Sequence, residues 1–263
     1  MLRQNMTKAK LKAGQPVIGM RMEFSSPYLV HSLGNLGLDF VYLDLEHGLI
    51  GEESCQEMLR AAETANLTPL VRVPLNETGT ITRVLDAGAM GIIASHCKSK
   101  EDAESAVKAV KLPPGGERGT AGPPGGMTLS EYITAVNRET LVIVMIEESE
   151  ALDNLSSILT VAELDVLFIG RLDLSLSFGI PGQIDSPRVQ RAVERIITEG
   201  KAAGKAVGVG AINVGDPGSI REFIKRGAQF FSLNTVSLLK NSTVHLLNEI
   251  KRDSSNSPGR GVR

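Results

Sequence analysis

Residues 40–48 read Phe-Val-Tyr-Leu-Asp-Leu-Glu-His-Gly, and both the fold and the site can be approached from this stretch. Four apolar residues with strand character run directly into Asp44, Glu46 and His47. A continuous apolar run bounded by polar residues is typical of a parallel strand that is buried on both faces. Histidine titrates near neutral pH unaided, and a nearby carboxylate can tune its basicity. Asp44 and His47 therefore form a candidate general-base pair; the alternative is a loop whose polar residues are solvated or cap a helix.

Similar apolar segments recur along the whole chain and alternate with amphipathic helical segments. We expect strands at residues 16–20, 40–43, 69–73, 90–94, 141–146, 165–169, 206–209 and 229–233. We expect helices near residues 27–36, 53–65, 78–87, 101–111, 150–160, 187–203, 217–226 and 236–250. A capping residue before proline marks two helix starts, at Ser186 and Asp216. Four glycines are placed to end helices in the left-handed conformation, namely Gly37, Gly88, Gly204 and Gly227.

This alternation decides the fold class. Strands that alternate with helices imply a parallel sheet, and right-handed crossovers can close eight such units into a barrel. An open doubly wound sheet is the rival arrangement, but no Gly-x-Gly-x-x-Gly turn follows the first strand. The sequence therefore predicts an α/β protein built as a single-domain (β/α)₈ TIM barrel over residues 1–252. We expect the polar, Gly/Pro-containing tail at 253–263 to be disordered.

The composition narrows the class of protein. With 42% hydrophobic residues, 22% charged residues and a net charge of −2, the chain has no basic excess, so we expect no nucleic-acid partner. No run of about 18 apolar residues occurs, and the N-terminus lacks a signal-peptide core, so we expect a cytoplasmic protein without a membrane partner. Cys55 and Cys97 are too few for a disulfide framework or a zinc site.

Polar residues follow several of the predicted strands. In a (β/α)₈ barrel the catalytic groups lie at the C-terminal ends of the strands. The third strand carries Arg72 in Val-Arg-Val-Pro, the fifth ends at Glu147, and the sixth leads to Asp173. Two carboxylates on neighbouring strands could share a hard cation such as Mg²⁺, while the fork of Arg72 suits a carboxylate or 2-oxo acid. The alternatives are a surface acid at 147, a helix cap at 173 and a structural ion pair at 72.

Taken together, these segments resemble the HpcH/HpaI aldolases, the metal-dependent class II pyruvate aldolases, over roughly residues 8–250. The resemblance includes 2,4-dihydroxyhept-2-ene-1,7-dioate aldolase. It is carried by Leu-Asp-Phe-Val-Tyr-Leu-Asp-Leu-Glu-His-Gly at 38–48, Val-Arg-Val-Pro at 71–74, Asp-Ala-Gly-Ala-Met-Gly at 86–91, Pro-Pro-Gly-Gly-Glu-Arg-Gly at 113–119, Met-Ile-Glu at 145–147 and Asp-Val-Leu-Phe-Ile-Gly-Arg-Leu-Asp-Leu-Ser at 165–175.

The resemblance implies roles for the candidate residues. Glu147 and Asp173 would be the metal ligands, and His47 with Asp44 would be the base dyad. Glu46 would support these groups from behind. Substrate contacts are implied for Arg72, Gly170, Arg171 and Leu172. The implied reaction makes or cleaves a 4-hydroxy-2-oxo acid through a pyruvate-type enolate, with Mg²⁺ expected as cofactor and Mn²⁺ or Co²⁺ as alternatives. The implied partners are a 2-oxo acid (pyruvate or oxaloacetate) and an aldehyde or acyl acceptor, and family members usually form homohexamers.

The chain also departs from the family pattern. His96 and Cys97 follow strand four where a proline is usual, and we interpret them as a packed or solvated pair. Arg171 replaces a proline, and with Arg21 it suggests a dicarboxylate such as oxaloacetate. A condensing synthase that joins oxaloacetate to an acetyl thioester, as in siderophore pathways, is therefore an alternative. Arg118 is a candidate anion clamp in a loop over the mouth.

Two further classes compete with a metal-dependent enzyme. A Schiff-base lyase would need a lysine at a strand end, and Lys98 is the nearest candidate. A non-catalytic barrel that binds metal or 2-oxo acids is the remaining alternative.

Overall fold

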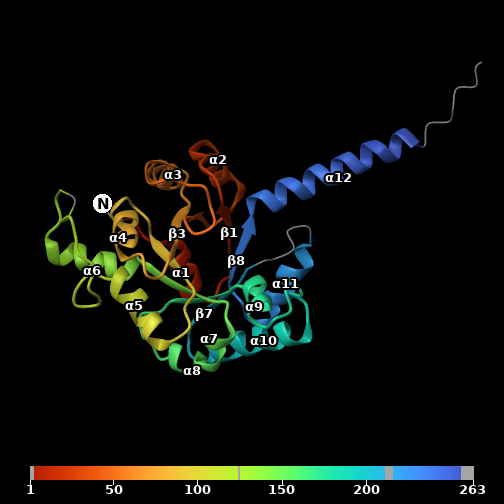
Figure 1. The fold of residues 1–263 in the computed structure, drawn as a ribbon. Coiled ribbons are helices and arrows are strands. Elements are labelled where there is room, and N and C mark those ends of the chain that lie inside the picture. The colour runs from red at the N-terminus through yellow and green to blue at the C-terminus, as the bar shows by residue number, and fades with distance from the viewer. Residues whose placement is uncertain (1–2, 124, 211–215, 256–263) are drawn as a thin grey trace, which may run out of the picture.

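Eight parallel strands close into a barrel, as the sequence predicts (Figure 1). The computed structural model describes residues 3–123, 125–210 and 216–255. Each strand pairs with the next one along the chain, and the last pairs with the first. The strands are β1 (Val17–Met22), β2 (Phe40–Asp44), β3 (Thr68–Pro74), β4 (Gly91–Ser95), β5 (Leu141–Ile146), β6 (Val166–Ile169), β7 (Ala206–Val209) and β8 (Phe230–Asn234).

Most of the helices connect the strands and surround the barrel, whereas α12 follows β8 and projects away from it (Figure 1). They are α1 (Met6–Lys12), α2 (Pro27–Leu33), α3 (Glu52–Thr64), α4 (Thr78–Asp86), α5 (Lys100–Val110), α6 (Leu129–Glu139), α7 (Ser149–Asp153), α8 (Leu155–Ile158), α9 (Arg171–Ser177), α10 (Pro187–Ala202), α11 (Pro217–Arg226) and α12 (Thr235–Ser255), with a short 3₁₀ helix at Gly34–Leu36. The predicted helix at 150–160 is divided into α7 and α8. The predicted helices did not include α1, α6 or α9, although Thr128 and Glu131 form a capping box that signals the start of α6.

The predicted helix boundaries agree with the backbone. Side chains of Ser186 and Asp216 cap the starts of α10 and α11, each followed by proline. The four glycines predicted to end helices all have positive φ: Gly37, Gly88, Gly204 and Gly227. At the other end, α12 runs to Ser255, beyond the predicted start of the tail at 253, while residues 256–263 of that tail lie outside the described part. No helix of the described part is long and apolar enough to cross a membrane.

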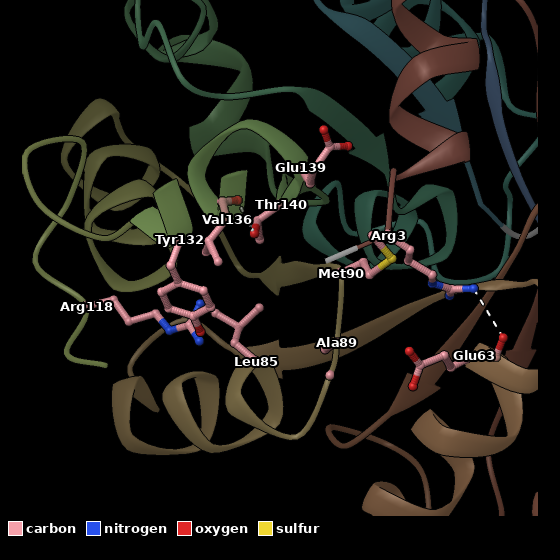
Figure 2. A pocket seen from close by; sticks show the side chains of 11 residues that line it. Arg3, Glu63, Leu85, Ala89, Met90, Arg118, Tyr132, Val136, Glu139 and Thr140 are labelled. Atoms are coloured by element: carbon pink, nitrogen blue, oxygen red, sulfur yellow. Dashed lines mark hydrogen bonds between the residues drawn. The ribbon is translucent and has the colours of Figure 1, made fainter. Parts of the chain in front are cut away.

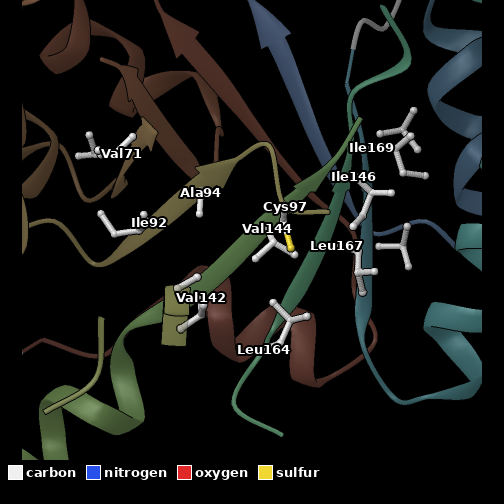
Figure 3. Close-up of a cluster of buried hydrophobic side chains, with 14 of the residues drawn as sticks. Val71, Ile92, Ala94, Cys97, Val142, Val144, Ile146, Leu164, Leu167 and Ile169 are labelled. Atoms are coloured by element: carbon white, nitrogen blue, oxygen red, sulfur yellow. The ribbon is translucent and has the colours of Figure 1, made fainter. Parts of the chain in front are cut away.

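Side chains alternate between two faces along each strand, because successive Cβ atoms of a strand point to opposite sides. On β2, Val41 and Leu43 belong to the large core cluster that includes helix residues, whereas Phe40 and Tyr42 belong to a second cluster made of strand residues and Leu11 of α1. Part of the large cluster, drawn in Figure 3, consists of Val71, Ile92, Ala94, Cys97, Val142, Val144, Ile146, Leu164, Leu167 and Ile169. The second cluster fills the barrel interior.

Aromatic rings fill the barrel interior opposite glycines. The rings of Phe40 and Phe230 stack with centroids 4.3 Å apart, and Phe168 meets Phe230 edge-on at 5.3 Å. A Cβ atom at Gly19 would lie 2.3 Å from the ring of Phe40, and one at Gly208 would lie 2.8 Å from that of Phe230. Leu11 of α1, the helix that precedes β1, packs into this interior cluster, so the packed end of the barrel is the one where the strands begin. The open end is therefore the C-terminal one, where β2 ends in Asp44.

We therefore expect Gly19→Ala to destabilise the fold, because a methyl group at this position collides with the buried ring of Phe40. Overpacking of this kind costs about 1–3 kcal/mol. Urea unfolding followed by circular dichroism measures the change in free energy. Gly119→Ala is the matched control, since no heavy atom lies within 4 Å of its added methyl group. Equal stability of the two variants would contradict the packing argument.

Candidate active site

Because every second side chain of a strand points into the barrel, several polar side chains point inward at its open end. Asp44 follows Phe40 and Tyr42 on the inward face of β2, and Arg72 is its register partner on β3. Glu147 directly follows β5, two residues after Met145, which belongs to the interior cluster. Asp44, Arg72 and Glu147 therefore lie on the same inward face of the barrel as the interior apolar residues two positions before them.

Asp44 lies at the centre of this arrangement, fully buried between two arginines. Arg72 donates from Nε to Oδ1 at 2.8 Å and from Nη2 to Oδ2 at 2.5 Å, and Arg21 donates from Nε to Oδ2 at 2.7 Å. Burial acts to raise the pKa of Asp44, but the hydrogen bonds and charge of Arg72, joined by Arg21, outweigh it and hold this pKa below its ordinary value. The carboxylate is thus ionised and shared by β1, β2 and β3.

The contacts of Asp44 differ from those expected for a base dyad of Asp44 and His47. Asp44 Oδ1 accepts the backbone N–H groups of Glu46 and His47, both at 3.1 Å. The imidazole of His47 is 58% exposed, and its Nε2 lies 3.9 Å from Oε2 of Glu46. In this structure Asp44 and His47 are therefore joined through the His47 backbone, and Asp44 orients the loop that carries the ring.

His96, which we expected to be packed or solvated, has a side chain that is 53% exposed, and this side chain also lies among carboxylates. Its backbone N–H donates to Oε1 of Glu147 at 2.9 Å, and its ring nitrogens lie 3.1 Å from Glu46 and 3.0 Å from Glu148. The expectation does hold for Cys97, which is buried in the outer core, where burial raises the pKa of its thiol to about 12. The one signal for His96 was its departure from the family pattern after strand four.

Glu147 and Asp173 have the chemistry of a cation site. The side chain of Glu147 is 2% exposed, and burial, with a smaller contribution from the charge of Asp173, raises its pKa to about 7 against the lowering by His96. A buried carboxylate beside a second acid favours a bound cation. A Cβ atom at Gly170 would lie 2.7 Å from Glu147 Oε2, so glycine is needed there. Two carboxylates with room for water and substrate fit Mg²⁺, although no three His, Cys, Asp or Glu side chains of the described part form a metal cluster.

A cavity of about 400 Å³ opens beside these groups at the C-terminal ends of the strands. Of the predicted residues, those in its wall are His47, Arg72, Gly170, Arg171, Leu172 and Asp173, together with Arg21. Asp44, Glu46 and Glu147 are not among the lining residues. The prediction missed Ser232 and Asn234 of β8, which also line the cavity and lie on the inward face of that strand.

Arg171 belongs to the cavity wall and not to the outer surface. It is buried, its Nε donates to the carbonyl of Gly210 at 3.1 Å, and its guanidinium lies 5.3 Å from the ring centroid of Phe223. Its Nη1 lies 3.5 Å from Asp185, an exposed acid. The arginine predicted at the mouth is therefore present there and held by several contacts.

Arg118 is not a clamp over the mouth, and this expectation was wrong. Its Nη2 pairs with Asp86 at 2.6 Å, and its side chain lines a different cavity of about 270 Å³ (Figure 2). That cavity is also lined by Met90 and Thr140, the residues just before β4 and β5. The cavity therefore lies at the N-terminal end of the barrel, and the loop after α5 carries Arg118 to it on the way toward the start of β5.

Comparisons with known proteins place the sequence and the fold in one family. The model of the HpcH/HpaI aldolase/citrate lyase family matches residues 18–237. The hydroxypyruvate/pyruvate aldolase of Agrobacterium fabrum is 32% identical over 98% of this chain and 97% of that protein. The 4-hydroxy-2-oxo-heptane-1,7-dioate aldolase of Salmonella typhimurium is 32% identical over 90% of each chain. The crystal structure of the citrate synthase SbnG aligns with a TM-score of 0.85 at 30% identity, over 94% of this chain and 98% of that one.

Asp44→Asn should destabilise the protein strongly, because Arg72 and Arg21 would lose the charge that compensates their burial. Removing one partner of a buried ion pair costs about 3–5 kcal/mol. Urea unfolding provides the measurement. His47→Ala is the control, since its exposed ring should contribute within about 0.5 kcal/mol. A loss below about 1 kcal/mol in Asp44→Asn would show that Asp44 is not the structural centre of the site.

Proposed function

This chain belongs to the HpcH/HpaI aldolase/citrate lyase family and is an enzyme of the carbon–carbon lyase type, and from that premise we propose a specific reaction and roles for its residues. The protein is a divalent-metal-dependent aldolase that makes or cleaves a 4-hydroxy-2-oxo acid through a pyruvate-type enolate. One observation carries the proposal: His47, Arg72 and Asp173 line the same cavity, and Glu147 lies beside Gly170 in its wall.

Arg72 binds the 2-oxo acid substrate, pyruvate or oxaloacetate. Its guanidinium is held in place by Asp44 and by Glu46, whose Oε2 lies 3.1 Å from Nη1. Burial acts to lower the pKa of Arg72, but the hydrogen bond with Asp44 raises it above its ordinary value, so the group is always charged. A fixed cation of this kind binds the substrate carboxylate, or stabilises negative charge that develops on the enolate oxygen, without reorganising.

Glu147 and Asp173 would hold the metal, with Mg²⁺ expected and Mn²⁺ or Co²⁺ as alternatives. When bound, such a cation polarises the 2-oxo carbonyl as a Lewis acid. Gly170 and the first turn of α9, with Arg171 and Leu172, line the adjoining wall and orient the substrate through backbone and side-chain groups.

His47 moves the proton of the substrate hydroxyl. Its imidazole lines the cavity and is accessible, and histidine exchanges protons near neutral pH. Asp44 contributes by fixing the loop backbone through the N–H of His47. The lysine route is disfavoured: a hydrogen bond to Glu148 is the main cause that raises the pKa of Lys98, the reverse of what a nucleophilic amine needs.

A second candidate is a synthase that condenses oxaloacetate with an acetyl thioester. The observation in its favour is that Arg21 and Arg171 line the same cavity as Arg72, which suits a substrate with two carboxylates. Similarity to the citrate synthase SbnG also supports this candidate. The acceptor, an aldehyde or an acyl thioester, distinguishes the two.

We also propose a homo-oligomer, with the hexamer of the resemblance as the expected state. The support comes from α12, which extends away from the barrel (Figure 1). Its large exposed apolar side chains are Leu239, Val244, Leu246, Leu247 and Ile250. A patch of this kind is typical of an interface. Sedimentation velocity at micromolar concentration should give an oligomer, and a monomer would contradict this.

A cytoplasmic location belongs to the same proposal, supported by the free thiols of Cys55 and Cys97.

The central experiment is a screen of metal-stripped protein with Mg²⁺, Mn²⁺ or Co²⁺ added back. Pyruvate and oxaloacetate are each tested against short aldehydes and acetyl thioesters, and products are identified by mass spectrometry. We expect aldol products that depend on added metal. His47→Ala should lower turnover by about 10²–10⁴-fold through loss of acid–base catalysis, whereas His31→Ala, on α2, should not. Product from acyl thioesters alone would favour the synthase, and turnover of His47→Ala at the wild-type rate would exclude the assigned proton transfer.

A further inference from the structure

We propose that His96 is a positioning residue of the metal site, which holds one carboxylate oxygen of Glu147 by its backbone N–H and holds the neighbouring acids Glu46 and Glu148 by its imidazole. This inference rests on the proposed function, since it concerns the residue that holds a metal ligand of that function.

The backbone of His96 is unusual. Its φ is +59°, in the left-handed region that residues with a Cβ atom seldom adopt. In this conformation the N–H at the end of β4 donates to Oε1 of Glu147 at 2.9 Å, across to the end of β5. The other oxygen of Glu147, Oε2, lies against Gly170, which lines the cavity. One carboxylate oxygen is thus held by the protein, and the other faces the wall of the cavity.

The imidazole of His96 connects three carboxylates. Its Nε2 lies 3.1 Å from Glu46 Oε1, and its Nδ1 lies 3.0 Å from Glu148 Oε1 and 3.6 Å from Glu147 Oε1. Two of the three acids also pair with a cationic side chain: Glu46 with Arg72 at 3.1 Å and Glu148 with Lys98 at 2.9 Å. For Glu147, the basic side chain within 4 Å in the described part of the chain is that of His96, at 3.6 Å.

These contacts indicate positioning and not metal binding by the ring. Both ring nitrogens are occupied, one by Glu46 and the other by Glu148. The described residues also contain no arrangement of three His, Cys, Asp or Glu side chains that would hold a metal. Residues that orient a ligand from outside the coordination sphere change metal affinity by about 10–100-fold. His96 should therefore act on metal affinity through Glu147.

Isothermal titration of metal-stripped protein with Mn²⁺ tests the inference without any turnover. We expect His96→Ala to weaken Mn²⁺ binding by at least about tenfold. His96→Asn should recover much of the loss, because asparagine tolerates the left-handed backbone and keeps a side-chain donor. His96→Gly, which keeps the backbone N–H and removes the ring, should bind more weakly than wild type but more tightly than His96→Ala.

The control is His31→Ala, which removes an exposed imidazole of α2 whose Nδ1 lies 3.4 Å from Thr64 Oγ1; its Mn²⁺ affinity should equal that of wild type. Circular dichroism verifies that each variant is folded, and His96→Gly and His96→Asn carry the test if His96→Ala is not. Wild-type affinity in both His96→Ala and His96→Gly would overturn the role of His96. Failure of the wild-type protein itself to bind Mn²⁺ would instead overturn the metal-dependent function.

Discussion

The active-site end of this barrel depends on one buried carboxylate. Asp44 has no exposed surface and accepts hydrogen bonds from Arg72, Arg21 and two backbone N–H groups of its own loop. A buried charge is tolerable only when it is paired and fully hydrogen-bonded. The geometry that satisfies Asp44 also fixes the ends of β1, β2 and β3 relative to one another. The orientation of the Arg72 guanidinium, proposed to bind substrate, and the placement of the His47 loop both follow from it.

From this centre, opposite charges alternate around half of the rim. Arg72 contacts Glu46, Glu46 contacts His96, and His96 contacts Glu147 and Glu148 at the end of β5. Each group is held by its neighbour, so the two proposed substrate and metal groups are oriented by one connected network. The remaining wall of the cavity contains Gly170, Arg171 and Asp173 after β6 and Ser232 and Asn234 on β8.

Sequence reasoning succeeded where the information is local. Strand and helix positions follow from apolar periodicity and capping residues, and the strand ends at Asp44, Arg72 and Glu147 follow from counting along each strand. It was less informative where partners come from different strands. The carboxylate contacts of His96 and the position of Arg118 each depend on how separate loops turn after their strands, which no single segment encodes.

By itself, the sequence determined that eight strand–helix units alternate and that certain acids, a histidine and an arginine stand where strands end. The physical reason is that strand periodicity and helix capping act over a few residues. Only the tertiary structure decided which of these groups touch. The register between neighbouring strands brings Asp44 opposite Arg72, and the left-handed turn at His96 brings β4 to Glu147. Such contacts depend on barrel closure, in which residues distant along the chain become neighbours.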